Sequence, residues 1–231
     1  TRAVPPSVET FVITSVVQGM PTSSVTLRRS DVEALEGDGS LEILRKSGFE
    51  DALRAAQPGM VETEGLYPRF SWALTPNLQV SLFDPDNPMR ADLGIKLGAS
   101  YEIRPGLILS GAVTKKIIGN IDDAKGSSDS LAPHVRSDLV EYQRHGDPAI
   151  SHLTLAHYGR PMADVYSRVT LGYLEQMYGG VSGEVLWKPV DSRLALGLEV
   201  NYAKQRDFNQ LLAFRDYDVV TGHASAYYDF G

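Results

Sequence analysis

The segment from Ala91 to Arg104, ADLGIKLGASYEIR, decides the fold because its apolar residues recur at every second position. A β-strand directs successive side chains to opposite faces, so the segment predicts a strand with one apolar and one polar face. It is longer than the ~5–6 residues of an ordinary soluble strand, and a tilted strand needs roughly 9–11 residues to cross a bilayer. The apolar face holds Ala91, Leu93, Ile95, Leu97, Ala99, Tyr101 and Ile103, and the polar face holds Asp92, Gly94, Lys96, Gly98, Ser100, Glu102 and Arg104.

Similar alternation continues through the last two thirds of the chain. It is clearest at residues 165–173, 194–203 and 220–230, and less regular strands are predicted at 69–75, 78–83, 106–119, 134–144, 149–158 and 182–188. Clusters of Gly, Pro, Asp and Asn separate these segments and predict turns. The pattern predicts about ten strands in an antiparallel up-and-down meander.

The first 66 residues lack the long alternating runs of the rest of the chain and combine strand-like with helix-like segments. We therefore predict a small α/β domain over 1–66 and a β-barrel segment over 67–231. The β-branched run at 11–17 and the segment 24–27 predict two strands. Ser30 with Glu33 three residues later predicts the start of a short helix. A second helical stretch is expected within 41–56, interrupted at Gly48.

Composition excludes several functional classes. The 231 residues carry a net charge of −7, which argues against a dedicated nucleic-acid binder. The absence of cysteine excludes disulfides, Cys-ligated metals and cysteine nucleophiles. The uncharged run at 10–27 is too rich in Thr, Ser, Gly and Pro to predict a membrane helix.

Two architectures fit the alternation equally well. Strands of outer-membrane barrels place apolar side chains outside and polar ones inside, and the tyrosines near strand ends fit the aromatic girdles of such barrels. A soluble β-sandwich or a lipocalin-like barrel alternates in the same way, so both readings stay open. In the membrane reading, the polar faces predict these lumen-facing residues: Asp92, Lys96, Glu102, Arg104, Arg168, Glu199, His223 and Asp229.

Two charged strings near the C-terminus predict a cluster at one rim of the sheet. The residues are Gln205, Arg206, Asp207, Arg215 and Asp216. An Arg–Asp pair that pins a loop is the structural interpretation, and contact with a glycan is the functional one.

No catalytic or metal-binding motif appears in the sequence, so we expect a non-enzymatic protein without a cofactor. The sequence contains no HExxH, P-loop or GxGxxG. The five histidines have no ligand-like spacing. Glu184 and Glu199 lie on neighbouring predicted strands and form the one carboxylate pair to consider for glycoside hydrolysis.

Residues 69–231 resemble the YjbH-type exopolysaccharide biosynthesis family, which is predicted to consist of outer-membrane β-barrel proteins encoded with capsule or exopolysaccharide secretion genes. The N-terminal part is similar to the small α/β domain that these proteins place before a barrel. Many members are lipid-modified and much longer than this chain, so we expect a piece of a longer protein whose other strands complete the barrel. The matching segments are 81–88, 90–93, 131–138, 170–181, 202–207 and 214–223.

The resemblance implies a non-enzymatic role in exopolysaccharide or capsule export, at the bacterial outer membrane, with the N-terminal domain in the periplasm. The expected partners are outer-membrane lipid, polysaccharide and other secretion proteins, with no nucleic acid. Two alternatives remain at this point: a soluble β-rich carbohydrate-binding module and a glycan-modifying hydrolase.

Overall fold

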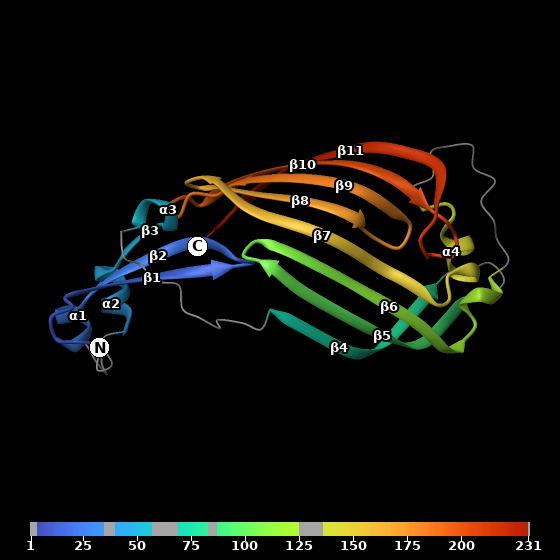
Figure 1. The fold of residues 1–231 in the computed structure, drawn as a ribbon, viewed down its shortest axis with the longest axis horizontal. Coiled ribbons are helices and arrows are strands. Elements are labelled where there is room, and N and C mark those ends of the chain that lie inside the picture. The colour runs from blue at the N-terminus through green and yellow to red at the C-terminus, as the bar shows by residue number, and fades with distance from the viewer. Residues whose placement is uncertain (1–3, 35–39, 57–68, 83–86, 125–135, 231) are drawn as a thin grey trace.

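A computed structural model describes residues 4–34, 40–56, 69–82, 87–124 and 136–230. The described chain is mainly β, with two antiparallel sheets and a few short helices (Figure 1). The boundary expected between residues 66 and 67 lies outside the described residues. No helix in the described ranges is long and apolar enough to cross a membrane.

The smaller sheet lies at the N-terminal end of the molecule and has the strand order β1-β2-β3. Gln18 and Gly19 form the tight β1–β2 turn with positive φ angles of 51° and 74°, as hairpin turns of this length require. The predicted second helical stretch is partly wrong, because strand β3 interrupts it and pairs with β2. Together with three short helices this sheet is called the small unit; its elements are β1 (Thr10–Val17), β2 (Met20–Arg28), α1 (Arg29–Ala34), α2 (Ser40–Lys46), β3 (Gly48–Asp51) and α3 (Ala52–Ala55).

The larger sheet has eight strands, and each pairs only with its neighbours in sequence, in the order β4 to β11. Strands β4 and β11 are its edges and do not pair with each other in the described residues, so the sheet is an open meander and no closed barrel is seen. Its strands are β4 (Phe70–Leu82), β5 (Met89–Arg104), β6 (Leu107–Gly119), β7 (Ala149–Met162), β8 (Val165–Tyr173), β9 (Tyr178–Trp187), β10 (Leu194–Arg206) and β11 (Phe214–Tyr228).

Three of the predicted strands are corrected by the structure. The strands expected at 69–75 and 78–83 form one strand, β4, which continues through Pro76. Proline is tolerated there because β4 is an edge strand, where a missing backbone donor leaves no central ladder bond unmade. The strand expected at 134–144 is replaced by helix α4 (Leu139–His145) in its described part, and α4 packs its Tyr142 into the hydrophobic core.

The two faces of the large sheet differ in the way the alternation predicts. One row of directly paired residues crosses all eight strands and is apolar throughout. We call it the apolar row; it consists of Phe70, Tyr101, Leu109, Leu155, Leu171, Val181, Tyr202 and Val220, each 36–67% exposed.

A small cluster of buried hydrophobic side chains forms a core around α4. Tyr142, Met177 and Tyr178 form it, with Leu139 and Phe208 packed against them. The large apolar side chains of the strands lie outside this core, on the exposed face. A soluble monomer rarely exposes one contiguous apolar patch of this extent. The exposed apolar face therefore distinguishes this sheet from the sheet of an ordinary soluble protein.

Candidate functional site: the polar face and its rim

The opposite face of the large sheet is polar and forms the inner side of its curve. A cavity of about 440 Å³ on this face is lined by residues from β4, β5 and β6 and also by Tyr142 of α4 and Gln210 of the β10–β11 connection. A single cavity reaches from edge strand β4 to this connection, which shows that the sheet curls around its polar side (Figure 1).

Charged side chains in this first cavity neutralise one another. Lys116 lies between Asp92, at 4.0 Å, and Asp122, at 2.5 Å. The hydrogen bond from Lys116 lowers the pKa of Asp122 below its usual value. Asp147, which lines the same cavity from the connection between β6 and β7, pairs with Lys115 of β6 at 2.6 Å. The interior is therefore polar with paired charges, as a hydrated cavity in such a sheet requires.

A second set of polar residues forms a line of direct cross-strand partners from β7 to β11. Arg168 donates to Glu184, with its Nε 2.8 Å from Oε1. On the next strand, β10, the side-chain amide of Asn201 donates to the Glu199 carboxylate at 2.6 Å. Each carboxylate of the Glu184–Glu199 pair thus has its own donor, which reduces the repulsion that like charges at paired positions produce. The line consists of Tyr158, Arg168, Glu184, Glu199 and His223.

The predicted lumen-facing residues divide into two groups. Asp92, Lys96, Arg168, Glu199 and His223 line cavities on the polar face. Glu102, Arg104 and Asp229 lie at the end of the sheet beside the small unit. Sequence reasoning missed Tyr158, Lys116, Asp122 and Asp147. Strict alternation along the strands could have found Tyr158, which pairs with Arg168, and Lys116, which pairs with Gly94 near Lys96. Asp122 and Asp147 lie on the β6–β7 connection, where the sequence shows no strand alternation.

The structure brings the predicted rim residues together. Gln205, Asp207, Arg215 and Asp216 line one surface groove of about 560 Å³ at the α4 end of the sheet. Arg206 lies behind this groove and is fully buried. The expected Arg–Asp contact exists between Arg215 and Asp207, at 3.8 Å.

Arg206 pins the loops of the rim through carbonyl oxygens rather than through an aspartate. Its guanidinium donates to the carbonyls of Glu175, at 2.8 Å, and of Gln210, at 2.7 Å. Its own carbonyl accepts from the Tyr142 hydroxyl, which also donates to the Met177 carbonyl at 3.3 Å. One buried arginine therefore ties α4 to both loops that flank it.

Burial raises the pKa of Tyr142 to about 12, which makes the rim sensitive to alkali. A tyrosine in the unfolded chain ionises near pH 10, so the folded form binds its proton more tightly. The stabilisation is complete below about pH 10 and is lost as the pH rises toward about 12. Chemical denaturation at pH 9 to 12 should show this loss. In Tyr142→Phe we expect lower stability at pH 8 and a flatter slope above pH 10, whereas an unchanged slope would contradict the role of this hydroxyl.

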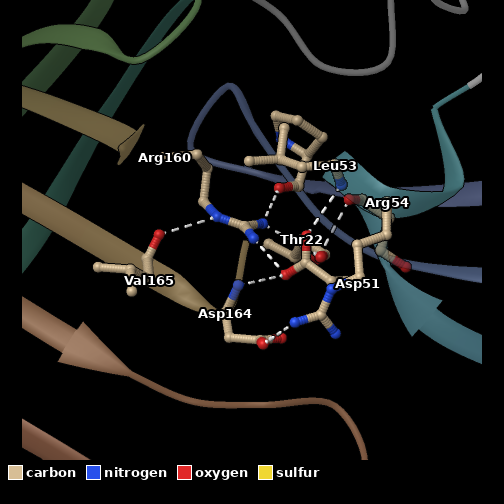
Figure 2. A network of polar contacts seen from close by, with 9 residues as sticks. Thr22, Asp51, Leu53, Arg54, Arg160, Asp164 and Val165 are labelled. Carbon is tan, nitrogen blue, oxygen red and sulfur yellow. Dashed lines mark hydrogen bonds and ion pairs between the residues drawn. The ribbon is translucent and has the colours of Figure 1, made fainter. Parts of the chain in front are cut away.

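At the opposite end of the sheet, a buried network joins the small unit to the β7–β8 turn (Figure 2). Arg160 and Asp51 form an ion pair whose side chains are 4% and 0% exposed. The Asp51 carboxylate also accepts from the backbone amides of Asp164 and Leu53, both at 2.9 Å. Arg160 donates further to the carbonyls of Thr22 and Val165, both at 3.1 Å. We call this arrangement the Asp51–Arg160 lock.

The ionised form of Asp51 is favoured by the lock. Burial is the largest single influence and raises the pKa, but the amides of Asp164 and Leu53 and the Arg160 guanidinium together outweigh it. The net result is a pKa of Asp51 below its usual value. The arginine is further held by the Tyr166 ring, 4.0 Å below its guanidinium.

The geometry defines a class of protein. It is a mainly β protein whose antiparallel meander is apolar outside and polar inside, with a small α/β unit fixed to one end. The sequence matches the family described as "Exopolysaccharide biosynthesis protein YbjH" over residues 1–231, and the chain belongs to this YjbH family. The resemblance inferred from the sequence is thereby confirmed.

One curated relative is the "Uncharacterized lipoprotein YjbH" of Escherichia coli (strain K12). It is 34% identical over 166 residues, which cover 69% of this chain and 24% of the relative. The chain therefore matches about a quarter of that relative's length. The relative is a lipoprotein by its description, which is consistent with a location in the cell envelope. No solved structure matches the chain.

Proposed function

We propose that the large sheet is part of an outer-membrane β-barrel that serves exopolysaccharide or capsule export without catalysing a reaction. The apolar row carries this proposal, because eight directly paired apolar residues cross all eight strands while remaining 36–67% exposed. Lipid chains are the environment in which such a surface is stable. The strands are 9–16 residues long, which is enough to cross the hydrocarbon at a tilt.

Aromatic side chains on the apolar face support a membrane boundary near the small unit. Phe70, Trp72 and Tyr101 lie at the end of β4 and β5, and Trp187 and Tyr228 close β9 and β11 at the same end. All five are 40–65% exposed. Tyrosine and tryptophan gather where barrel strands meet the headgroups, so this belt fits the interface on that side.

The lengths of the connections support an orientation. Strands β5 and β6 are joined by residues 105–106, and β7 and β8 by residues 163–164, both next to the small unit. The β9–β10 connection, residues 188–193, lies at the same end as these turns, and the longest connection, residues 120–148, which carries α4, lies at the other end. Barrels of this type have short periplasmic turns and longer outer loops. The small unit is therefore assigned to the periplasm and α4 to the cell surface.

The polar face is the surface proposed to meet the polysaccharide, either as a conduit wall or as a platform. The unpaired edges of β4 and β11 need hydrogen-bonding partners in lipid, where unpaired backbone groups are unfavourable. We propose that strands from other parts of the protein supply them, as the greater length of the relative suggests. Other secretion proteins are the proposed partners at the periplasmic end.

Heat-modifiability in detergent tests the proposal. The full-length protein is refolded in detergent, and its gel mobility is compared unboiled and boiled, with circular dichroism in detergent and in plain buffer. We expect a mobility shift and β-type dichroism that requires detergent, because the apolar row needs an apolar solvent. A monomer that folds in plain buffer and shows no shift would replace this proposal with a soluble glycan-binding module.

A further inference from the structure

A surface groove opens at the α4 end of the sheet, between α4 and the β10–β11 connection. Its volume of about 560 Å³ lies within the range of small-molecule sites. We propose that this groove is a binding subsite for a hydroxyl-rich sugar unit that carries no negative charge; the inference rests on the proposed function in glycan export. We call it the rim groove; it is lined by Asp138, Gln205, Asp207, Phe208, Phe214, Arg215, Asp216 and Tyr217.

The walls of the rim groove are fixed before any ligand arrives. Gln205 is 3% exposed and donates to Asp138 at 2.7 Å. The amide of Asp207 donates to the Ala213 carbonyl at 2.9 Å, which closes the loop. Arg206 holds the same loop from behind. Binding therefore requires little ordering of the protein, which favours affinity.

Aromatic rings supply the apolar part of the rim groove. Phe214 is 44% exposed and packs against Tyr173, with ring centroids 5.4 Å apart. Phe208 is covered by the Arg215 guanidinium, 4.1 Å from its ring centroid. Phe214 is therefore a supported ring that remains accessible, and the apolar face of a sugar ring can stack on such a surface.

The charges of the groove select against acidic sugars. Three carboxylates, from Asp138, Asp207 and Asp216, face one guanidinium, from Arg215. Asp207 is paired with Arg215 at 3.8 Å. The Asp216 side chain is exposed and makes no hydrogen bond or ion pair with any residue that the structure describes. Carboxylates accept hydrogen bonds from hydroxyl or ammonium groups and repel a uronate.

The position of the groove is consistent with an exit or docking point. Its lining residues belong to the start of α4, the end of β10, the start of β11 and the connection between these strands, which lie at the end of the sheet opposite the small unit (Figure 1). A polymer leaving the polar face at this end would pass close to this groove. The groove is thus placed to hold one unit of the chain, not to line its whole path.

The test measures binding of three tetrasaccharides to the full-length protein in lauryldimethylamine oxide, which has no sugar headgroup. The probes are neutral cellotetraose, cationic chitosan tetramer and anionic tetragalacturonate, titrated calorimetrically. We expect dissociation constants on the order of a millimolar or tighter for the first two and at least about tenfold weaker binding of the third. Phe214→Ala should weaken both binding probes about tenfold, and Asp216→Asn should weaken the cationic probe selectively.

Leu212→Ala is the matched control, because Leu212 is 71% exposed in the same loop and does not line the groove. Its affinities should equal those of the unchanged protein. Equal affinity for all three probes, or no binding by protein that passes the heat-modifiability test, would overturn the subsite while leaving the membrane barrel intact. Should Phe214→Ala not fold, Asp216→Asn still decides, because its effect must differ between the cationic and the neutral probe.

Discussion

Asp51→Ala is expected to destabilise the attachment of the small unit to the large sheet by about 3–5 kcal/mol. The substitution leaves Arg160 buried, at 4% exposure, without its carboxylate. It also removes the acceptor of the Asp164 and Leu53 amides. Hydrogen exchange of β2 and β3 should become faster, and their denaturation midpoint should fall.

Two variants sharpen this prediction. Glu50→Ala removes the neighbouring, exposed carboxylate and should change stability by less than about 0.5 kcal/mol. Asp51→Ala combined with Arg160→Met should recover part of the loss, because no unpaired charge then remains buried. Equal effects of Asp51→Ala and Glu50→Ala would show that the lock contributes nothing.

The lock also predicts a dependence on acid. The pKa of Asp51 is lowered in the folded protein, so its contribution is complete above the unfolded value of about 3.9 and is lost as the pH falls through the folded value. Exchange of β2 and β3 should therefore accelerate below about pH 4. The Asp51→Ala variant should lack this component of the pH profile.

Leu171→Arg is expected to destabilise the folded protein in a bilayer by about 2–4 kcal/mol, because it places a charge on the lipid face of a barrel strand. Leu171 belongs to the apolar row and is 55% exposed. The same substitution on the surface of a soluble protein would change stability by only about 0.5 kcal/mol. Denaturant titration of protein folded into phospholipid vesicles measures the difference.

Thr170→Arg is the matched control for this prediction. Thr170 is the preceding residue of β8 and points to the polar face, where it lines a cavity. An added charge there remains hydrated and should change stability by about 1 kcal/mol or less. Equal effects at the two positions would contradict a lipid-facing apolar row.

The alternation of the strands allowed most of the large sheet to be predicted. Period-two patterns around Leu97, Leu171 and Leu198 identify strands and also which face is polar, since both properties follow from the same local geometry. Helix α4 escaped prediction because its one fully buried side chain, Tyr142, leaves no apolar stripe in the sequence. The two strands predicted at 69–75 and 78–83 form one strand through Pro76 because β4 lies at the edge of the sheet. This edge position is set by the tertiary arrangement and cannot be read from the local sequence.

The lock could not be predicted, because its partners are distant in sequence and match no motif. Asp51 is the last residue of the short strand β3, whereas Arg160 lies near the end of β7 and Asp164 in the turn that follows, more than a hundred residues later. Each looks like an ordinary surface charge when taken alone. The rim cluster was predictable in composition, but the separation of a buried Arg206 from an exposed Asp216 follows from the packing of α4.

The sequential strand order has a consequence for how the sheet assembles. In the large sheet, every strand pair except β6–β7 is closed by a short connection, so these hairpins have low contact order and little loop-closure entropy to overcome. Strands β6 and β7 are separated by residues 120–148. Strands β4 to β6 and strands β7 to β11 can therefore form as two local hairpin arrays. Pairing of β6 with β7 then joins the two arrays and is expected to be the last step in forming the sheet.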